Sequence, residues 1–290
     1  MSSPKAESGK ARIGYEARLN RVVDYIYDHL EDDIRFDDLA KVACLSPWHW
    51  HRIYTAMRGE TIAATIRRLR LSRAAERLAN SDMAVATIAS RAGYGSLDTF
   101  RRAFKETYGK SPADYRLSGS HVAFKAALQA KDGAFFPVSI ETLAPVRCAS
   151  VAHTGSYMQI DRAMGQLFAK LAEQGSMAAD QRMLALFYDD PDLVPLDDMR
   201  SRACSPVLDG IAWNLPIEEV ILRGGVYARL RYRGPYADMK NAYRWLLGVW
   251  LPQSGHEPDD APVFEAYLNS PEEVGPTELL TDIHLPLRAS

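Results

Sequence analysis

A single acidic residue, Glu265, stands in an otherwise apolar and aromatic segment near the end of the sequence. Successive side chains of a strand point to opposite faces. Glu265 and Tyr267 are therefore predicted to share a concave face, with Phe264 on the opposite, helix-packed face. A carboxylate among aromatic rings suits a cation or a polar group of a small molecule. The residues predicted to line this ligand site are Glu265, Tyr157, Tyr188, Tyr236, Tyr267, Leu186 and Trp213.

Simpler interpretations of these residues stay open. Glu265 could be an exposed strand glutamate, and Tyr157 and Tyr236 could be core residues whose hydroxyl groups are satisfied within the fold. Tryptophans at helical spacing, such as Trp245 and Trp250, pack in cores more often than they line ligand cavities.

Charge is divided unevenly along the chain. Residues 1–118 contain 20 Lys+Arg against 15 Asp+Glu, a net charge of +5, whereas the remainder contains 15 against 22, a net charge of −7. A basic half joined to an acidic half indicates that the first half meets a polyanion.

The basic half contains a repeated helical pattern. Leu39, Ala40 and Ala43 recur as Ile88, Ala89 and Ala92 at an offset of 49 residues, and Ser46, Trp50 and Tyr54 recur as Ser96, Phe100 and Phe104 at an offset of 50. Each copy is predicted to form a short helix, a tight turn and an amphipathic helix, which is the helix-turn-helix arrangement. A long helix from Thr61 to Leu78 is predicted to join the copies, and a first helix over Tyr15–Leu30 precedes them.

Residues that read DNA bases must lie on the exposed face near the start of a recognition helix. Arg52 and Arg102 are the strongest candidates, because a guanidinium group can pair with guanine through two hydrogen bonds. An ion pair with a neighbouring carboxylate, or contact with phosphate alone, is the alternative. The arginines of the long joining helix are assigned at most to phosphate contacts. The predicted DNA-contacting residues are Trp48, His51, Arg52, Asp98, Arg101, Arg102 and Lys105.

The basic half resembles the AraC/XylS family of transcription activators over about residues 18–116. The resemblance rests on Gly95-Ser96-x-x-Thr99-Phe100-x-Arg102-x-Phe104-Lys105 and on Gly109-Lys110-Ser111-Pro112-x-x-Tyr115-Arg116. It implies two recognition helices on one rigid helix, which enter successive major-groove segments of double-stranded DNA.

A second repeat occupies the acidic half. Gly155-Ser156-Tyr157 matches Gly234-Pro235-Tyr236, and Tyr188 matches Tyr267, at an offset of 79 residues. Each copy is predicted to form a strand, a turn, a helix and a returning strand. Two copies would form one antiparallel sheet with both helices on one face, leaving the other face free to curve around a ligand. The predicted helices are Gln159–Gln174 and Asp238–Trp250, the returning strands are Met183–Tyr188 and Val263–Leu268, and the repeat places Leu184, Leu186 and Tyr188 on the face of Glu265.

This half resembles the GyrI-like effector-binding domains over about residues 136–287. The matching motifs are His153-Thr154-Gly155-Ser156-Tyr157, Tyr188-Asp189-Asp190-Pro191, Gly234-Pro235-Tyr236, Trp250-Leu251-Pro252 and Phe264-Glu265-Ala266-Tyr267-Leu268. The resemblance implies a small-molecule effector, with Glu265 at the position of the glutamate that meets the ligand in that family.

The predicted fold class is an all-α double helix-turn-helix domain followed by an α+β domain of duplicated strand-helix-strand units. The boundaries are an unstructured lead-in over 1–14, a DNA-binding domain over 15–118, a partly helical linker over 119–134 and an effector domain over 135–290. The three cysteines, Cys44, Cys148 and Cys204, lack metal-ligand spacing, so no metal or cofactor is predicted. Scattered cysteines and no apolar run of about 18 residues predict a cytoplasmic, nucleoid-associated protein with no membrane partner.

The sequence thus predicts a DNA-binding transcription regulator, not an enzyme, whose C-terminal domain binds a lipophilic effector, for which a cation is one candidate. Effector binding would alter contact between the domains or contact with RNA polymerase. Two other functions stay open: a small-molecule hydrolase or ligand-sequestering protein that uses Glu265 with Tyr157 or Tyr236, and a constitutive DNA-binding protein. Operator, effector identity, activation against repression, and oligomeric state are not fixed by the sequence.

Overall fold

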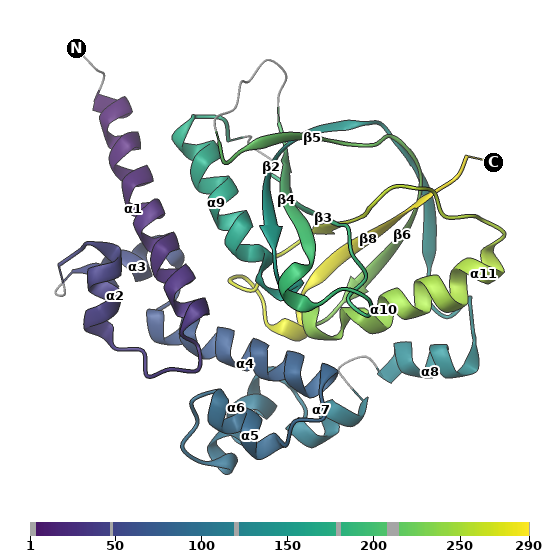
Figure 1. The fold of residues 1–290 in the computed structure, drawn as a ribbon, viewed down its shortest axis with the longest axis horizontal. Helices are drawn as coiled ribbons and strands as arrows, with labels where there is room; N and C mark the ends of the chain where they lie inside the picture. The colour runs from purple at the N-terminus through teal and green to yellow at the C-terminus, as the bar shows by residue number, and fades with distance from the viewer. Residues whose placement is uncertain (1–3, 47–48, 119–121, 178–180, 208–214, 290) are drawn as a thin grey trace.

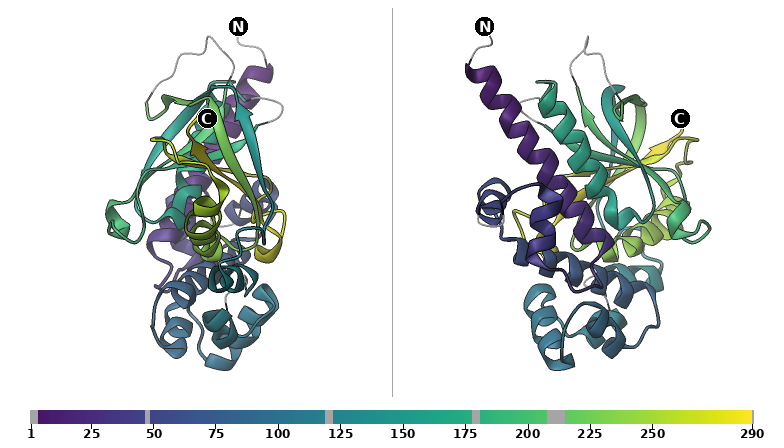
Figure 2. Two further views of the ribbon diagram at one scale, coloured as in Figure 1. Left: turned by 90° about the vertical axis from the view of Figure 1, so that its right-hand side faces the viewer. Right: turned by 60° about the vertical axis from the view of Figure 1, so that its left-hand side comes forward.

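The computed structural model describes residues 4–46, 49–118, 122–177, 181–207 and 215–289. A helical part lies against a curled sheet that carries its own helices (Figure 1). The two further views show the same arrangement, with the second helix-turn-helix unit farthest from the sheet (Figure 2). The two-domain fold class predicted from the sequence is confirmed.

The helical part contains two small cores on the two halves of one long helix, α4. The first core joins Leu19, Leu39, Trp50 and Tyr54 to Leu69 of α4. The second joins Leu71, Ala75 and Leu78 of α4 to Phe100 and Phe104. Because one continuous helix contributes to both cores, it fixes the two units relative to each other. The helices are α1 (Pro4–Asp28), α2 (Phe36–Ala43), α3 (Trp50–Arg58), α4 (Ile62–Asn80), α5 (Val85–Arg91), α6 (Leu97–Tyr108) and α7 (Pro112–Ser118).

Local sequence signals explain where these helices begin and end. The hydroxyl groups of Thr61 and Ser96 accept hydrogen bonds from the backbone N–H groups of Ala64 and Thr99, both at 3.2 Å, and so cap α4 and α6. Gly59 ends α3 with a φ of 74°, a left-handed conformation that glycine adopts without a steric penalty.

Two predicted boundaries differ from the structure. The expected unstructured lead-in is helical from Pro4, since its lysine, alanine, glutamate and arginine residues favour helix. The first helix, predicted to run to Leu30, ends at Asp28. Within the predicted linker, α8 (Val122–Ala130) is helical and packs near α10.

The C-terminal part is one eight-stranded antiparallel sheet with the strand order β1-β6-β8-β7-β3-β4-β2-β5. Helix α9 (Ile160–Glu173) packs on β2 and β4. Helix α10 (Met239–Trp245) packs with β6 and β8 and continues through a π-helical turn, Leu246–Trp250, into α11 (Leu251–Ser254). The strands are β1 (Val138–Leu143), β2 (Val146–Thr154), β3 (Met183–Phe187), β4 (Arg200–Pro206), β5 (Glu218–Leu222), β6 (Gly225–Arg233), β7 (Val263–Tyr267) and β8 (Leu280–Leu287).

The two central strands pair in a register that the sequence repeat did not predict. Ala185 lies opposite Glu265, and Leu186 lies opposite Phe264. Leu186 therefore faces away from Glu265, and its predicted place beside Glu265 is wrong. The first strands and the turns of the two copies differ by 79 residues, but the returning strands β3 and β7 differ by 80. One extra residue moves every side chain of a strand to the other face.

The predicted assignment of the two sheet faces is also wrong. Glu265 lies on the face that carries α9 and α10. Phe264 lies on the opposite face, which the prediction left free for a ligand. That face is instead filled where the sheet curls over a core of its own, made of Cys148, Leu184, Leu186, Cys204, Leu222, Tyr227 and Phe264.

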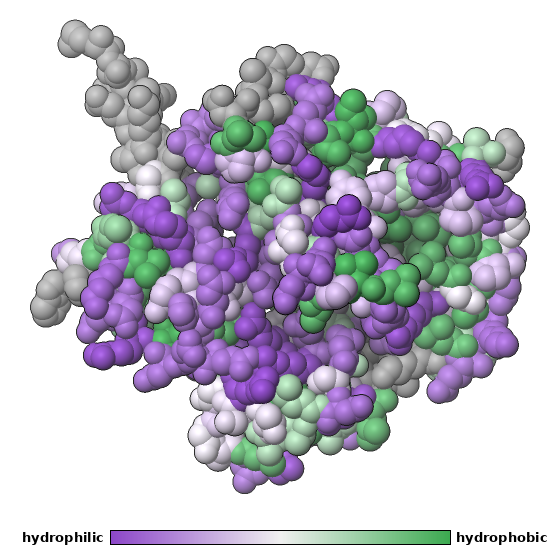
Figure 3. Space-filling view, viewed as in Figure 1, coloured by the Kyte–Doolittle hydropathy of each residue, from purple (hydrophilic) through white to green (hydrophobic). Residues whose placement is uncertain are grey.

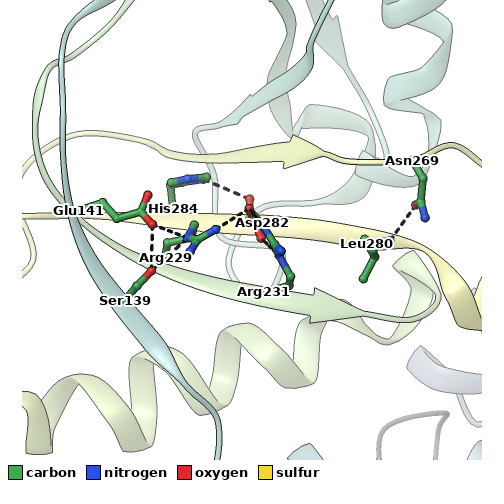
Figure 4. Close-up of polar contacts among 8 residues, drawn as sticks. All are labelled: Ser139, Glu141, Arg229, Arg231, Asn269, Leu280, Asp282 and His284. Atoms are coloured by element: carbon green, nitrogen blue, oxygen red, sulfur yellow. Dashed lines mark hydrogen bonds and ion pairs between the residues drawn. The ribbon is translucent and has the colours of Figure 1, made fainter.

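A charged network fixes β1, β6 and β8 on this outer face (Figure 4). Arg229 bonds to Glu141 at 2.6 Å and to Asp282 at 3.2 Å, and Arg231 holds both oxygens of Asp282 at 2.8 Å. Burial raises the pKa of Asp282, but the hydrogen bonds and charges of Arg231 and Arg229 outweigh burial and hold it below its ordinary value. The His284 ring stacks on Phe264 at 4.2 Å. These charges are mutually satisfied, so the network is structural.

Candidate ligand cavity and DNA-binding surface

A cavity of about 1860 Å³ lies on the helix-bearing side of the sheet. Its lining comes from α9, α10, the two central strands and α4 of the helical part. In the space-filling view, hydrophobic side chains gather over the sheet domain, whereas the surface over the first helix-turn-helix unit is mainly hydrophilic (Figure 3). The cavity thus lies between the sheet domain and the helical part.

Glu265 is the buried acidic group of this cavity, with 6% of its surface exposed. The Tyr243 hydroxyl donates a hydrogen bond to it at 2.7 Å, and within the described residues it forms no ion pair. Burial raises the pKa of Glu265 to about 7, although hydrogen bonds from Tyr243 and Tyr267 oppose this rise. The carboxyl is therefore close to half-protonated at neutral pH.

Aromatic rings surround this carboxyl group. The Tyr236 and Tyr267 rings meet edge to face at 5.6 Å, and the Tyr157 and Phe187 rings do so at 4.7 Å. The Tyr157 hydroxyl is already satisfied, since it donates to the Asp189 carbonyl at 2.9 Å and accepts from the Asp189 N–H at 3.0 Å. Tyr157 can thus offer its ring to a ligand while its hydroxyl holds the neighbouring loop.

Five of the seven predicted ligand residues line the cavity, namely Glu265, Tyr157, Tyr188, Tyr236 and Tyr267. Leu186 lies on the other face, and Trp213 lies outside the described residues.

Of two further aromatic residues, Trp245 packs in the core and Tyr243 lies at the ligand site. Trp245 is a core residue whose indole N–H donates to the Asp132 carbonyl at 2.9 Å, so the packing alternative is confirmed for it. The sequence analysis missed Tyr243, the direct partner of Glu265. Its position, seven residues after Tyr236, places it on the same side of the helical segment, and that spacing was the signal available.

The predicted DNA-contacting side chains are exposed on α3 and α6. His51 and Arg52 are exposed on the first turn of α3, and neither Arg52 nor Arg102 forms an ion pair within the described residues. Arg101 bonds to Asp98 at 3.3 Å, so that carboxylate is partly neutralised at the surface. Trp48 lies outside the described residues. The predicted residues that are exposed on α6 are Asp98, Arg101, Arg102 and Lys105.

Several arginines of α4 do not fit the predicted phosphate contacts. Arg70 donates to the backbone carbonyls of Leu30 and Asp32, each at 2.8 Å, and Arg68 pairs with Glu60 at 2.6 Å. These side chains tie α4 to its neighbours and are engaged within the protein.

Comparison with known proteins identifies both parts of the chain. A family described as GyrI-like small molecule binding domain matches residues 136–288, more than half of the chain, and a family described as helix-turn-helix domain matches residues 39–118. The chain belongs to the GyrI-like family. Its N-terminal part is a helix-turn-helix domain of the AraC type.

Individual relatives match mainly the helix-turn-helix part of this GyrI-like protein. Regulatory protein PocR of Salmonella typhimurium is 30% identical over 115 residues, which are 39% of this chain and 38% of PocR. Transcriptional regulator Rob of the same organism is 35% identical over 100 residues, 34% of this chain and 35% of Rob. The chain thus spans little more than a third of the length of these relatives.

Among solved structures, the C-terminal domain of EcmrR is 16% identical, with a TM-score of 0.46, and the match covers 53% of this chain and 99% of that domain. A search of the described helices of the GyrI-like protein found none with the length and apolar character needed to span a bilayer.

The raised pKa of Glu265 predicts a pH-dependent stability. Folding favours the protonated carboxyl, so its contribution is fully present below the unfolded pKa near 4.5 and is lost as pH rises through about 7. We expect the free energy of unfolding of Glu265→Gln, relative to that of the wild type, to increase by roughly 2–3 kcal/mol when the pH is raised from 5 to 9. Urea unfolding at both pH values measures this, with the exposed Glu272→Gln as control. Parallel stability curves for wild type and Glu265→Gln would contradict the assignment.

Proposed function

We propose that this protein is a sequence-specific transcription regulator that binds double-stranded DNA through α3 and α6 and a lipophilic cation in the cavity beside Glu265. The observation that carries the effector proposal is a buried carboxyl group with tyrosine partners and no basic partner within the described residues. The family matches support the combination of DNA binding with small-molecule binding.

The chemistry of the cavity favours a cation with an apolar body. A buried ionised carboxylate without a partner is costly, and a bound cation would supply the missing charge. Tyrosine rings also attract cations through their faces. Methionine side chains, Met164 and Met183, and the ring of Phe187 add apolar walls, which suit a hydrophobic ligand of variable shape.

The exposed faces of α3 and α6 support the DNA proposal. Arg52 and Arg102 are free of carboxylate partners within the described residues, so the proposed guanine contacts require no ion pair to break. The proposed place of action is the cytoplasm, on the nucleoid. Contact with RNA polymerase is a second proposed partner interaction, through which effector binding would change transcription.

Effector binding is testable with two ions of the same shape and opposite charge. We expect tetraphenylphosphonium to bind more tightly than tetraphenylborate, because only the cation compensates Glu265. Glu265→Gln should weaken tetraphenylphosphonium binding about tenfold or more, equivalent to about 1.4 kcal/mol, and should not weaken tetraphenylborate binding. Isothermal titration calorimetry measures both, with Glu272→Gln as control.

Equal affinity for the two ions would contradict the cation proposal. A hydrolase is the competing function for Glu265 and its tyrosines, because a carboxyl group with a pKa near 7 suits a general base. Mass spectrometry of small-ester candidates after long incubation distinguishes the two, since an effector is recovered unchanged.

The DNA proposal predicts the effect of two substitutions. Arg52→Ala and Arg102→Ala should each lose roughly 1–3 kcal/mol of binding free energy for an operator selected from random DNA, and should relax the base preference at one position. Fluorescence anisotropy at several salt concentrations measures this. Arg233→Ala, an exposed arginine of the effector domain, is the matched control. Wild-type affinity of both recognition-helix variants would show that other residues read the DNA.

A further inference from the structure

Helix α4 of the helix-turn-helix domain forms one wall of the effector cavity. The residues that it contributes include Ala64, Arg68, Ser72 and Glu76, which recur every four positions and therefore follow one side of the helix. The same helix carries both helix-turn-helix cores. The ligand cavity and the scaffold of the DNA-binding domain thus share a structural element.

Helix α9 connects this cavity to the first helix-turn-helix unit. Its residues Ile160 and Met164 line the cavity. The neighbouring Asp161 accepts a hydrogen bond from the Tyr27 hydroxyl, and Arg162 bonds to two carboxylates of α1, at 3.1 and 2.9 Å. In Figure 1, α9 lies alongside α1 and the sheet domain lies over α4.

The two turns of the sequence repeat contact the second helix-turn-helix unit. Ala237 is buried in that unit's hydrophobic core, and Met158 packs against the same core. Ser156 donates a hydrogen bond to Glu76 of α4 at 3.3 Å. The effector domain therefore contacts both helix-turn-helix units, largely through residues that themselves line the cavity.

We propose that the effector binds between the two domains, with its cationic group beside Glu265 and the rest of its body extending to the α4 wall. This inference rests on the proposed function and extends it, because it makes the DNA-binding domain part of the ligand site. A volume of about 1860 Å³ exceeds the roughly 300–1,000 Å³ of ordinary ligand pockets, so the cavity has room for a bulky lipophilic cation that extends from Glu265 to α4. Effector binding and DNA binding are then coupled directly through α4.

Bulky substitutions on the two sides of α4 test this site. Ala64→Trp and Ser72→Trp place an indole on the cavity side, and Ala63→Trp places one at the adjacent exposed position. The probe is tetraphenylphosphonium, titrated calorimetrically into each full-length variant. We expect at least a fivefold loss of affinity for the two cavity-side variants and less than a twofold change for Ala63→Trp.

Two outcomes distinguish failure of this inference from failure of the proposed function. If Glu265→Gln loses the probe but both cavity-side variants bind it like the wild type, the ligand does not reach α4 and this inference fails alone. If the wild-type chain does not bind the probe, the proposed function fails and this inference with it.

A measurement on the wild-type chain tests the same proposal without a substitution that could impair folding. Coupling between two ligands is reciprocal. Saturating tetraphenylphosphonium should therefore change the dissociation constant for the selected operator, and saturating operator should change the dissociation constant for tetraphenylphosphonium by the same factor. We expect a factor of at least three. Independent binding of the two ligands would overturn the proposal.

Discussion

The carboxyl group of Glu265 lies between the helices of a duplicated domain, removed from water and held by tyrosine hydroxyl groups. Transfer of an ionised carboxylate into such surroundings is costly, and the raised pKa reports that cost. The position is set by the pairing of the two central strands, in which Ala185 of the first copy faces Glu265 of the second. Divergence between the copies has therefore left one carboxyl near the middle of the sheet.

The rest of the structure places this carboxyl next to the DNA-binding domain. Helices α9 and α10 form the sides of the cavity, and α4 closes it against the helix-turn-helix units. On α9, the cavity-lining Asp161 and the neighbouring Arg162 bind α1. A ligand that moved α9 by a small distance would thereby disturb its contacts with α1 of the first unit. Closely packed elements transmit such shifts, because they change between discrete arrangements and are hardly compressed.

Local features of the sequence were sufficient to predict much of this fold. The caps at Thr61 and Ser96 and the apolar spacing fixed the helix-turn-helix units, because those signals act within a few residues. Strand register was not predictable in the same way. One additional residue between Tyr236 and Val263, relative to the first copy, reversed the expected orientation of Leu186, and this change appears only in long-range pairing. The α4 wall of the cavity depends on domain packing, for which the sequence carries no local pattern.

The most direct test of this account is the proton balance of cation binding. A carboxyl with a pKa near 7 is about half-protonated at pH 7, and a bound cation favours its ionised form. Calorimetric titration of tetraphenylphosphonium at pH 7, in phosphate and in Tris, measures the protons exchanged from the difference in apparent enthalpy. We expect protons to be released when the cation binds, and this release to disappear in Glu265→Gln. Binding without proton release by the wild-type protein would contradict it.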